Sequence, residues 1–157
     1  MRLRGVVSVE SGYAGGTVEN PTYQHVSEGN TGHAEVIRVE YDPSQIKFSD
    51  LLNVFFATHD PTTLNRQGND VGTQYRSVIY YTTNEQKQQA ENFIKELESN
   101  GTYNGITTEV KPLDKFYKAE KYHERYYDSN PAQPYCQLVI NPKVAKLRQK
   151  FAPLLKE

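Results

Sequence analysis

Residues 59–76 constrain the fold of this chain more than any other stretch. They run His-Asp-Pro-Thr-Thr-Leu-Asn-Arg-Gln-Gly-Asn-Asp-Val-Gly-Thr-Gln-Tyr-Arg, which is too polar for a core and too specific in composition for a spacer. A connection of this length is usually either functional or disordered. Its Asp, Asn, Gln and Arg side chains can bond back to the backbone, and its glycines are isolated. We therefore predict an ordered loop with a functional role.

Regular elements are predicted on both sides of this loop. Before it, Phe48, Leu51, Leu52 and Phe55 recur at the spacing of an amphipathic helix near 47–58. After it, a strand is predicted at 75–82 and then a second helix, opened by the capping box Thr83-Asn-Glu-Gln and ended by Asn100-Gly101. The remaining expectations are strands at 5–13, 33–42 and 107–112, a loop at 14–32, a helical stretch at 115–128, an extended segment at 134–140, and a last helix from Asn141-Pro142.

The chain of 157 residues shows no repeat, linker or low-complexity tract. This favours a single domain over residues 1–157. Strands alternate with helices through connections of mixed length, which predicts an α+β fold. We expect a mixed β-sheet with packed helices, a two-layer sandwich with a ferredoxin-like core.

Composition restricts the partners of this chain. Its net charge of −1 gives no general electrostatic attraction to nucleic acid or to an anionic membrane. No apolar run reaches the length of a membrane span, and no signal-like segment follows Met1, so a cytoplasmic monomer is expected. The one cysteine, Cys136, excludes an internal disulfide and is either an inert buried thiol or a reactive one.

Glu35 gives the sharpest local signal of chemistry. Alternation along the second strand puts Glu35 on one face with Ile37, Val39 and Tyr41. Burial on such an apolar face would raise the pKa of the carboxyl group, as a general acid near neutral pH requires. The alternative is a glutamate at the strand end that simply reaches solvent.

Other polar residues admit two interpretations each. Tyr75 begins the predicted third strand and is either a core residue or a catalyst, whereas Tyr23 follows Pro21 in a turn and is either presented to a ligand or packed onto the core. Asp70 either orients a hydroxyl or water, or caps a turn. His33 and His59 have no neighbours at metal-ligand spacing, so no metal site is predicted.

Four motifs together resemble one known family. These are Gly-Tyr-Ala-Gly-Gly at 12–16, Asn-Pro-Thr-Tyr at 20–23, Gly-His-Ala-Glu at 32–35, and the polar run at 59–76. In this order they resemble the methionine sulfoxide reductase A family, over about residues 5–142. In that family a cysteine thiolate attacks the sulfur of a methionine S-sulfoxide, and the resulting sulfenic acid is reduced by a second cysteine and then thioredoxin.

The resemblance implies roles for individual residues. Glu35 would protonate the sulfoxide oxygen, Tyr23 and Tyr75 would donate hydrogen bonds to it, and Asp70 would hold a water or a supporting group. Cys136 falls near the resolving cysteine of the family, although its surroundings, Gln137-Leu-Val-Ile, suggest an ordered strand. If Cys136 is not used, an external thiol could reduce the sulfenic acid directly. No metal or organic cofactor is implied; the reductant is thioredoxin or another dithiol, and the substrates are oxidised proteins or free methionine sulfoxide.

One family motif, Gly-Cys-Phe-Trp with its nucleophilic cysteine, is absent from this sequence. The leading hypothesis is therefore a reductase domain that lacks its first segment and is inactive in thioredoxin-dependent turnover. A first alternative is a non-catalytic binder of oxidised methionine. A second is a domain that folds only when a separate segment supplies a missing strand.

Overall fold

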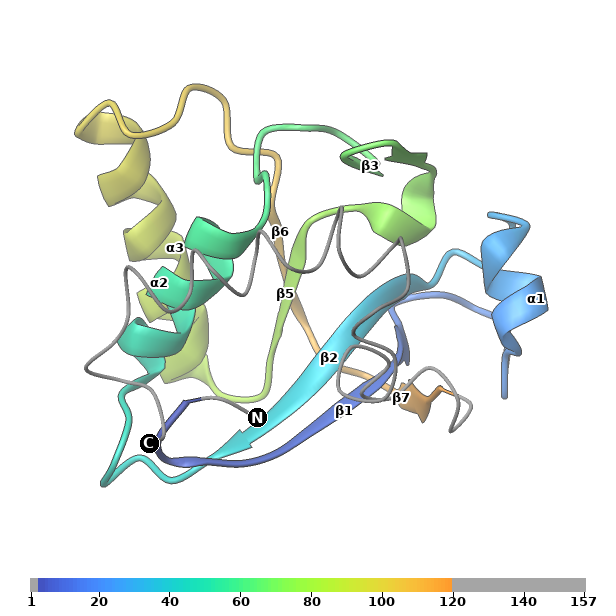
Figure 1. Ribbon diagram of the computed structural model, residues 1–157, viewed down its shortest axis with the longest axis horizontal. Helices are drawn as coiled ribbons and strands as arrows, with labels where there is room; N and C mark the ends of the chain where they lie inside the picture. The colour runs from blue at the N-terminus through green and yellow to red at the C-terminus, as the bar shows by residue number, and fades with distance from the viewer. Residues whose placement is uncertain (1–2, 120–157) are drawn as a thin grey trace, which may run out of the picture.

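The computed structural model describes residues 3–119, and these form an α+β arrangement (Figure 1). The predicted fold class is confirmed. The elements in chain order are β1 (Val6–Ala14), α1 (Tyr23–Ser27), β2 (Ala34–Tyr41), α2 (Phe48–Thr58), β3 (Arg66–Gln67), β4 (Asp70–Val71), the 3-10 helix η1 (Thr73–Tyr75), β5 (Val78–Tyr81), α3 (Asn84–Ser99), β6 (Glu109–Pro112) and β7 (Phe116–Lys118).

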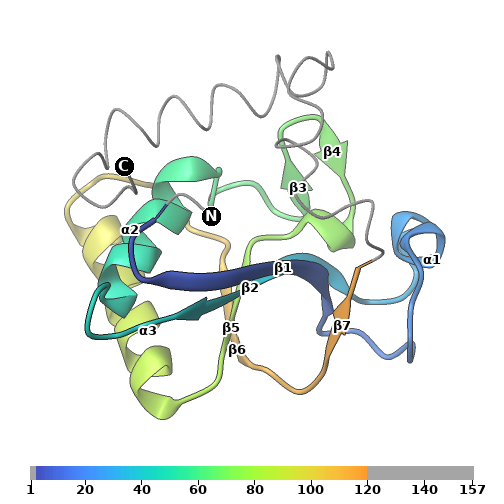
Figure 2. The same cartoon turned by 60° about the horizontal axis from the view of Figure 1, so that its bottom comes forward.

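A long antiparallel hairpin of β1 and β2 crosses the molecule (Figure 2). Tyr13 pairs with Glu35 in its register, and β7 pairs antiparallel with the other edge of β1. An irregularity between Val6 and Ser8 breaks the alternation, so Val6 is buried while Val7 is 56% exposed. Simple alternation along the strand predicted at 5–13 would place Val7, Val9 and Tyr13 on one face. That expectation is wrong for Val7, because a bulge shifts the side-chain period.

Helices α2 and α3 pack against each other and against the parallel pair β5–β6 (Figure 1). Leu52, Phe56 and Ala90 are buried at the centre of this core, and the ring of Phe56 stacks on Phe93 at 5.6 Å. The apolar spacing of both helices predicted this packing, and Thr83 caps α3 by accepting a hydrogen bond from the Gln86 N–H.

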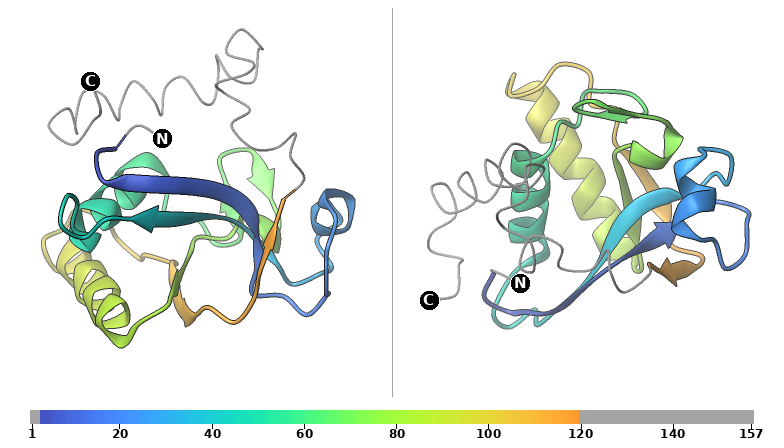
Figure 3. Two further views of the ribbon diagram at one scale, coloured as in Figure 1. Left: turned by 90° about the horizontal axis from the view of Figure 1, so that it is seen from below. Right: turned by 45° about the vertical axis from the view of Figure 1, so that its right-hand side comes forward.

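Parallel and antiparallel strand pairs both occur, as expected for a mixed β-sheet, but these pairs belong to separate sheets. Within residues 3–119 the strand orders are β2-β1-β7, β3-β4 and β5-β6. The β1–β2 hairpin runs past the helices at one end and reaches α1 and β7 at the other (Figure 3). The space between the hairpin, α2 and β5 contains the candidate site.

Several predicted elements differ from the structure. Residues 116–118 form β7 instead of a helix, because they pair with Gly12–Ala14 of β1. The predicted loop at 14–32 contains the short helix α1, with Thr22 as its N-cap. Tyr75 lies in η1 and not on the strand, which begins at Val78. The extended segment at 134–140 and the last helix lie outside the described residues.

Candidate functional site

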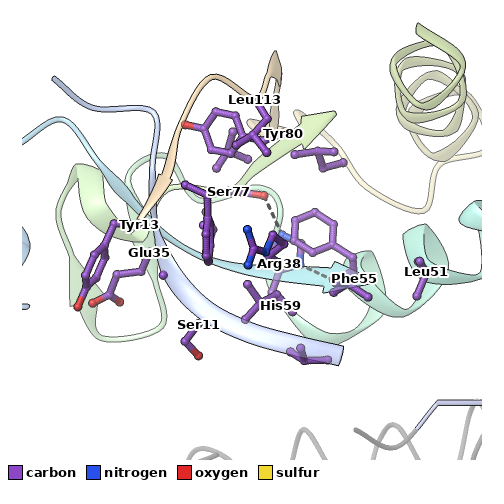
Figure 4. Close-up of a pocket in the computed structure, with 18 of the residues that line it drawn as sticks. Ser11, Tyr13, Glu35, Arg38, Leu51, Phe55, His59, Ser77, Tyr80 and Leu113 are labelled. Atoms are coloured by element: carbon purple, nitrogen blue, oxygen red, sulfur yellow. Dashed lines mark hydrogen bonds between the residues drawn. The ribbon is translucent and has the colours of Figure 1, made fainter. Parts of the chain in front are cut away.

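An open cavity of about 800 Å³ lies between the β1–β2 hairpin and the layer made by α2 and β5. Figure 4 shows Tyr13 and Glu35 from the hairpin near one end, and Phe55 and Leu51 of α2 toward the other. Its walls therefore combine an aromatic and aliphatic side with a polar end. A cavity of this composition is typical of a small-molecule or side-chain binding site.

The four site residues expected from the sequence within the described region line this one cavity: Tyr23, Glu35, Asp70 and Tyr75. Tyr23 is the first residue of α1, Glu35 lies on β2, Asp70 begins β4 and Tyr75 ends η1. Segments far apart in sequence thus bring two phenols and two carboxyl groups together. The fifth expected residue, Cys136, lies outside the described residues.

Electrostatics at the polar end favour the neutral form of Glu35. Glu35 remains accessible to solvent, yet the surrounding atoms remove part of the hydration of its carboxyl group. This desolvation, followed by the charge of Asp70, raises the pKa of Glu35 above its usual range. The expected direction of the shift is confirmed. Desolvation, the cause expected from the sequence, is the larger of the two effects. The strand face itself is less buried than expected, since Ile37 on that face is 61% exposed.

Tyr75 is likewise held in its protonated form. Burial raises the pKa of its hydroxyl group, and the charges of Glu35 and Asp70 raise it further. A phenol donor therefore lies in the same cavity as a carboxyl group that takes up a proton more readily than usual. Such a pair can stabilise an oxygen atom that gains negative charge during a reaction.

The polar loop at 59–76 is ordered by side chains that bond to the backbone, as predicted. The Gln67 amide donates to the Asp60 carbonyl at 2.6 Å, and Thr63 Oγ1 donates to the Arg66 carbonyl at 2.7 Å. The strands β3 and β4 pair through Gln67 and Asp70, and the Gly72 N–H donates to the Asn65 carbonyl at 2.8 Å. This small hairpin places Asp70 and η1 beside β2.

Arg76 fixes η1 relative to β2. Its guanidinium donates to the Thr73 carbonyl at 2.8 Å, to the Gly32 carbonyl at 2.9 Å and to Glu109 Oε1 at 3.2 Å. The Arg76 side chain is only 15% exposed. The guanidinium group of Arg76 thus connects η1, which contains Tyr75, to Gly32, which lies just before β2. The position of Tyr75 relative to Glu35 therefore depends on Arg76.

His33 anchors the glycine-rich segment that follows β1. It is 1% exposed; Nδ1 accepts a hydrogen bond from the Gly16 N–H at 3.0 Å, and Nε2 lies 2.7 Å from the Val18 carbonyl. The Val18 carbonyl can only accept, so Nε2 carries the proton and the ring is neutral with both nitrogens satisfied. His33 therefore stabilises the loop that contains Gly16 and Val18.

His59 connects α2 to β5. Its Nδ1 contacts the Phe55 carbonyl, its Nε2 lies 2.8 Å from Ser77 Oγ, and Ser77 Oγ lies 2.7 Å from Thr108 Oγ1 (Figure 4). Within residues 3–119, no group of three or more His, Cys, Asp or Glu side chains could hold a metal ion. None of the helices in that region has the length and apolar character needed to cross a lipid bilayer.

Sequence analysis missed Gln74 and Arg76 as members of the site. Both belong to the polar run at 59–76. Without tertiary contacts, however, the buried amide of Gln74 and the multiply bonded guanidinium of Arg76 cannot be distinguished from exposed polar side chains. The available signal was their position directly beside Tyr75.

Comparison with known proteins identifies the family to which this chain belongs. The model of the family described as "Peptide methionine sulfoxide reductase" matches residues 1–154. This chain belongs to that family, whose members are oxidoreductases that reduce methionine sulfoxide. The family assignment suggested by the four sequence motifs is thereby confirmed.

Individual relatives agree with this assignment. A curated peptide methionine sulfoxide reductase MsrA of Acinetobacter baumannii (strain AYE) is 55% identical over 156 residues, which is 99% of this chain and 89% of the relative. Among solved structures, the reduced form of Mxr1 from Saccharomyces cerevisiae has a TM-score of 0.78 at 36% identity, covering 84% of this chain and 76% of the other.

Two further solved structures are similar in fold. Methionine sulfoxide reductase A of Corynebacterium diphtheriae has a TM-score of 0.72 at 40% identity, covering 82% of this chain and 66% of the other. A structure of Mxr1 in complex with Trx2 has a TM-score of 0.52 at 24% identity, covering 78% and 67%. The latter match concerns the fold alone.

Proposed function

We propose that the polar end of the cavity binds the sulfoxide group of a methionine S-sulfoxide and protonates its oxygen. In this proposal Glu35 is the proton donor, Tyr23 and Tyr75 donate hydrogen bonds to the oxygen, and Asp70 holds a water or supporting group. The observation that carries the proposal is the carboxyl group of raised pKa beside Tyr75 in one cavity. A sulfoxide oxygen becomes a competent leaving group only when protonated, so a neutral acid beside it is the required chemistry.

The apolar side of the cavity suits the rest of the substrate. Phe55 and Leu51 of α2 lie toward the other end of the cavity and provide apolar surface for substrate groups beyond the sulfoxide, while the polar end takes the oxygen. Residues 3–119 contain no cysteine, and Cys136 is the one thiol in the sequence. The described residues thus supply the binding and proton-donating part of the reductase site.

Substitution of Tyr75 tests the binding proposal directly. Calorimetric titration with N-acetyl-methionine S-sulfoxide methylamide should show saturable binding, and Tyr75→Phe should weaken it about fivefold through loss of one hydrogen bond. Glu35→Gln should also weaken binding. Tyr81→Phe on β5, which does not line the cavity, is the matched control and should bind normally. Equal affinities for Tyr75→Phe and wild type would refute the assignment of Tyr75.

For the reductant, we propose thioredoxin or another external dithiol, with no bound cofactor. The support is family membership together with the solved complex of the relative Mxr1 with Trx2. Because Cys136 is the one thiol available, we expect no thioredoxin-dependent turnover by this sequence alone. Methionine formation driven by dithiothreitol and abolished in Cys136→Ser would contradict that expectation.

A second candidate function is binding of oxidised methionine without reduction. It is favoured by the presence of all four polar groups in a part of the chain that has no cysteine. Saturable sulfoxide binding without methionine formation would support this candidate, whereas absence of binding would exclude it.

Residues 1–157 are proposed to act as one domain, as a monomer in the cytoplasm, on oxidised proteins or free methionine sulfoxide. The lack of an apolar span or charge excess in the sequence supports this setting. Light scattering of the purified chain measures the oligomeric state, and a dimer would contradict the proposal.

A further inference from the structure

The turn between α3 and β6 contains both Asn-Gly dipeptides of the sequence, Asn100-Gly101 and Asn104-Gly105 (Figure 1). An asparagine before glycine loses its side-chain amide more readily than one before other residues, because glycine has no side chain to hinder attack by its own backbone nitrogen. All four residues are exposed. The two dipeptides thus form a matched pair in one turn, and their contacts decide which of them reacts.

Deamidation requires a free side-chain amide and a free backbone nitrogen. The glycine nitrogen attacks Cγ of the asparagine, a new C–N bond forms, and the amide nitrogen leaves as ammonia with the proton of the glycine N–H. Water then opens the resulting succinimide at one of its two carbonyl groups, which gives aspartate or isoaspartate. Water is the one co-reactant, and the step involves no change of oxidation state.

Asn100 is held away from this reaction. Its Oδ1 accepts hydrogen bonds from the Thr102 N–H at 3.0 Å and from the Thr102 hydroxyl. These contacts direct the side chain toward the residue two positions further on, as in an Asx turn. The Gly101 N–H donates to the Glu98 carbonyl at 3.3 Å, at the end of α3. The amide of Asn100 and the nitrogen that would attack it are therefore both engaged.

Asn104 lacks both restraints. Within residues 3–119, neither its side chain nor the Gly105 N–H makes a hydrogen bond. The glycines themselves do not distinguish the two dipeptides, because φ is +72° at Gly105 and +79° at Gly101, and a Cβ atom at either position would have no neighbour within 4 Å. The difference between the two asparagines is thus their hydrogen bonding.

The residues on both sides of Asn104 are anchored to other parts of the fold. The Tyr103 hydroxyl donates to the Phe56 carbonyl of α2 at 2.8 Å, and the Ile106 N–H donates to Glu98 Oε2 at 3.3 Å. Isoaspartate at position 104 would add one carbon atom to the main chain between these two anchors. It would also place a negative charge in the same turn as the Glu98 carboxylate. Both changes weaken the connection between α3 and β6.

We propose that Asn104 is a site of spontaneous deamidation in the folded protein, whereas the hydrogen bonds of Asn100 protect it. The modification replaces a neutral amide by a carboxylate in the turn that joins α3 to β6. This inference does not depend on the proposed function, because residues 100–105 do not line the cavity.

Incubation of the folded chain near neutral pH in water enriched in oxygen-18, followed by trypsin digestion and mass spectrometry, measures both rates. Residues 96–115 form one tryptic peptide, and its fragment ions separate Asn100 from Asn104. We expect Asn104 to deamidate about tenfold faster, because the hydrogen bonds of Asn100 must open before it can react. Equal rates, or faster loss at Asn100, would overturn the proposal.

Two further measurements test the protection of Asn100. In concentrated urea the hydrogen bonds of the turn are lost, so the two rates should converge. Thr102→Val removes the hydroxyl that donates to Asn100, and it should speed deamidation of Asn100 about threefold while leaving the rate at Asn104 unchanged. A tenfold difference that persists in urea would assign the effect to local sequence and overturn the proposal.

The consequence for the turn is measured on protein that has been stored until deamidation is complete at Asn104. The stored wild type should unfold at a lower temperature than fresh protein. Asn104→Gln should keep its initial Tm, because the longer side chain closes the ring less readily. Asn100→Gln is the matched control and should decline as the wild type does. An equal decline of Asn104→Gln and wild type would overturn the proposed effect on the turn.

Discussion

At the scale of single residues, the raised pKa of Glu35 links the site to the stability of the whole chain. Desolvation and the charge of Asp70 disfavour the carboxylate in the folded state, so its pKa is higher folded than unfolded. The folded protein then binds the proton more tightly than the unfolded chain does. The stability contributed by the protonated group is fully present below the unfolded pKa and is lost as pH rises through the folded pKa.

Replacement of Glu35 should therefore stabilise the protein near neutral pH. Glu35→Gln removes the charge penalty, and because the residue is accessible to solvent we expect a gain below about 1 kcal/mol, or a Tm rise of about 1–3 °C at pH 7. At a pH below the ordinary carboxyl range, the two proteins should unfold at nearly the same temperature. Thermal unfolding followed by circular dichroism measures both conditions.

The control for this prediction is Glu96→Gln, on the exposed face of α3, which should leave Tm nearly unchanged. A lower Tm for Glu35→Gln at pH 7 would show that the carboxylate, and not the acid, is the form the fold favours. The same variant weakens sulfoxide binding in the proposed function. Residues of functional sites often lower the stability of the folded protein in this way.

At the scale of elements, the guanidinium of Arg76 joins η1, the start of β2, and β6. It donates to the Thr73 and Gly32 carbonyls, to Glu109 and to the Tyr80 hydroxyl. A lysine ammonium has no planar fork and cannot reach all four acceptors at once. Arg76→Lys should lower the free energy of unfolding by about 2 kcal/mol, which corresponds to a Tm decrease of about 4–8 °C. It should also weaken sulfoxide binding, because Tyr75 is no longer held near Glu35.

Arg66→Lys provides the matched comparison on β3. Arg66 is exposed and its Nε donates to the Gly68 carbonyl, so the change should cost less than about 0.5 kcal/mol. Urea unfolding of both variants gives the two free energies. Similar losses for Arg66→Lys and Arg76→Lys would contradict the role given to the buried guanidinium.

Helices and strands could be predicted from the sequence where apolar residues recur at one regular spacing along the whole segment. The apolar spacing of α2 and α3 gave their bounds closely, because each helix buries one stripe against the other. Tyr75 was placed on a strand because it precedes alternating apolar residues, but η1 intervenes, with the Tyr75 N–H bonded to the Gly72 carbonyl at 3.0 Å. Local turns of this kind depend on backbone angles that side-chain periodicity does not encode.

The candidate site was predictable residue by residue only through family resemblance. Alternation along β2 pointed to Glu35, but its convergence with Asp70 and Tyr75 is a tertiary property. No local pattern predicts which distant loops meet, and the charge of Asp70, from another element, contributes to the raised pKa of Glu35. The burial of Gln74 could not be predicted for the same reason, since its amide donates to the Ser27 carbonyl of another element.

At the scale of the whole molecule, the cavity joins parts of the fold that are not hydrogen-bonded into one sheet. The β1–β2 hairpin provides one wall, while α2 and β5 provide the other, and β2 and β5 belong to different sheets. A ligand that contacts both walls binds only when they are correctly placed relative to each other. Binding must therefore stabilise the folded molecule as a unit instead of one local segment.

Sulfoxide binding should accordingly raise the temperature of global unfolding. A ligand present at 100 times its Kd stabilises the native state by about 2.7 kcal/mol, which corresponds to a Tm increase of about 5–11 °C for a chain of this size. The same concentration of N-acetyl-methionine methylamide, which lacks the sulfoxide oxygen, should give a much smaller shift because Tyr75 then has no acceptor. Differential scanning calorimetry measures both shifts. Equal increases with the two ligands would mean that the apolar side of the cavity, and not Glu35 and Tyr75, accounts for recognition.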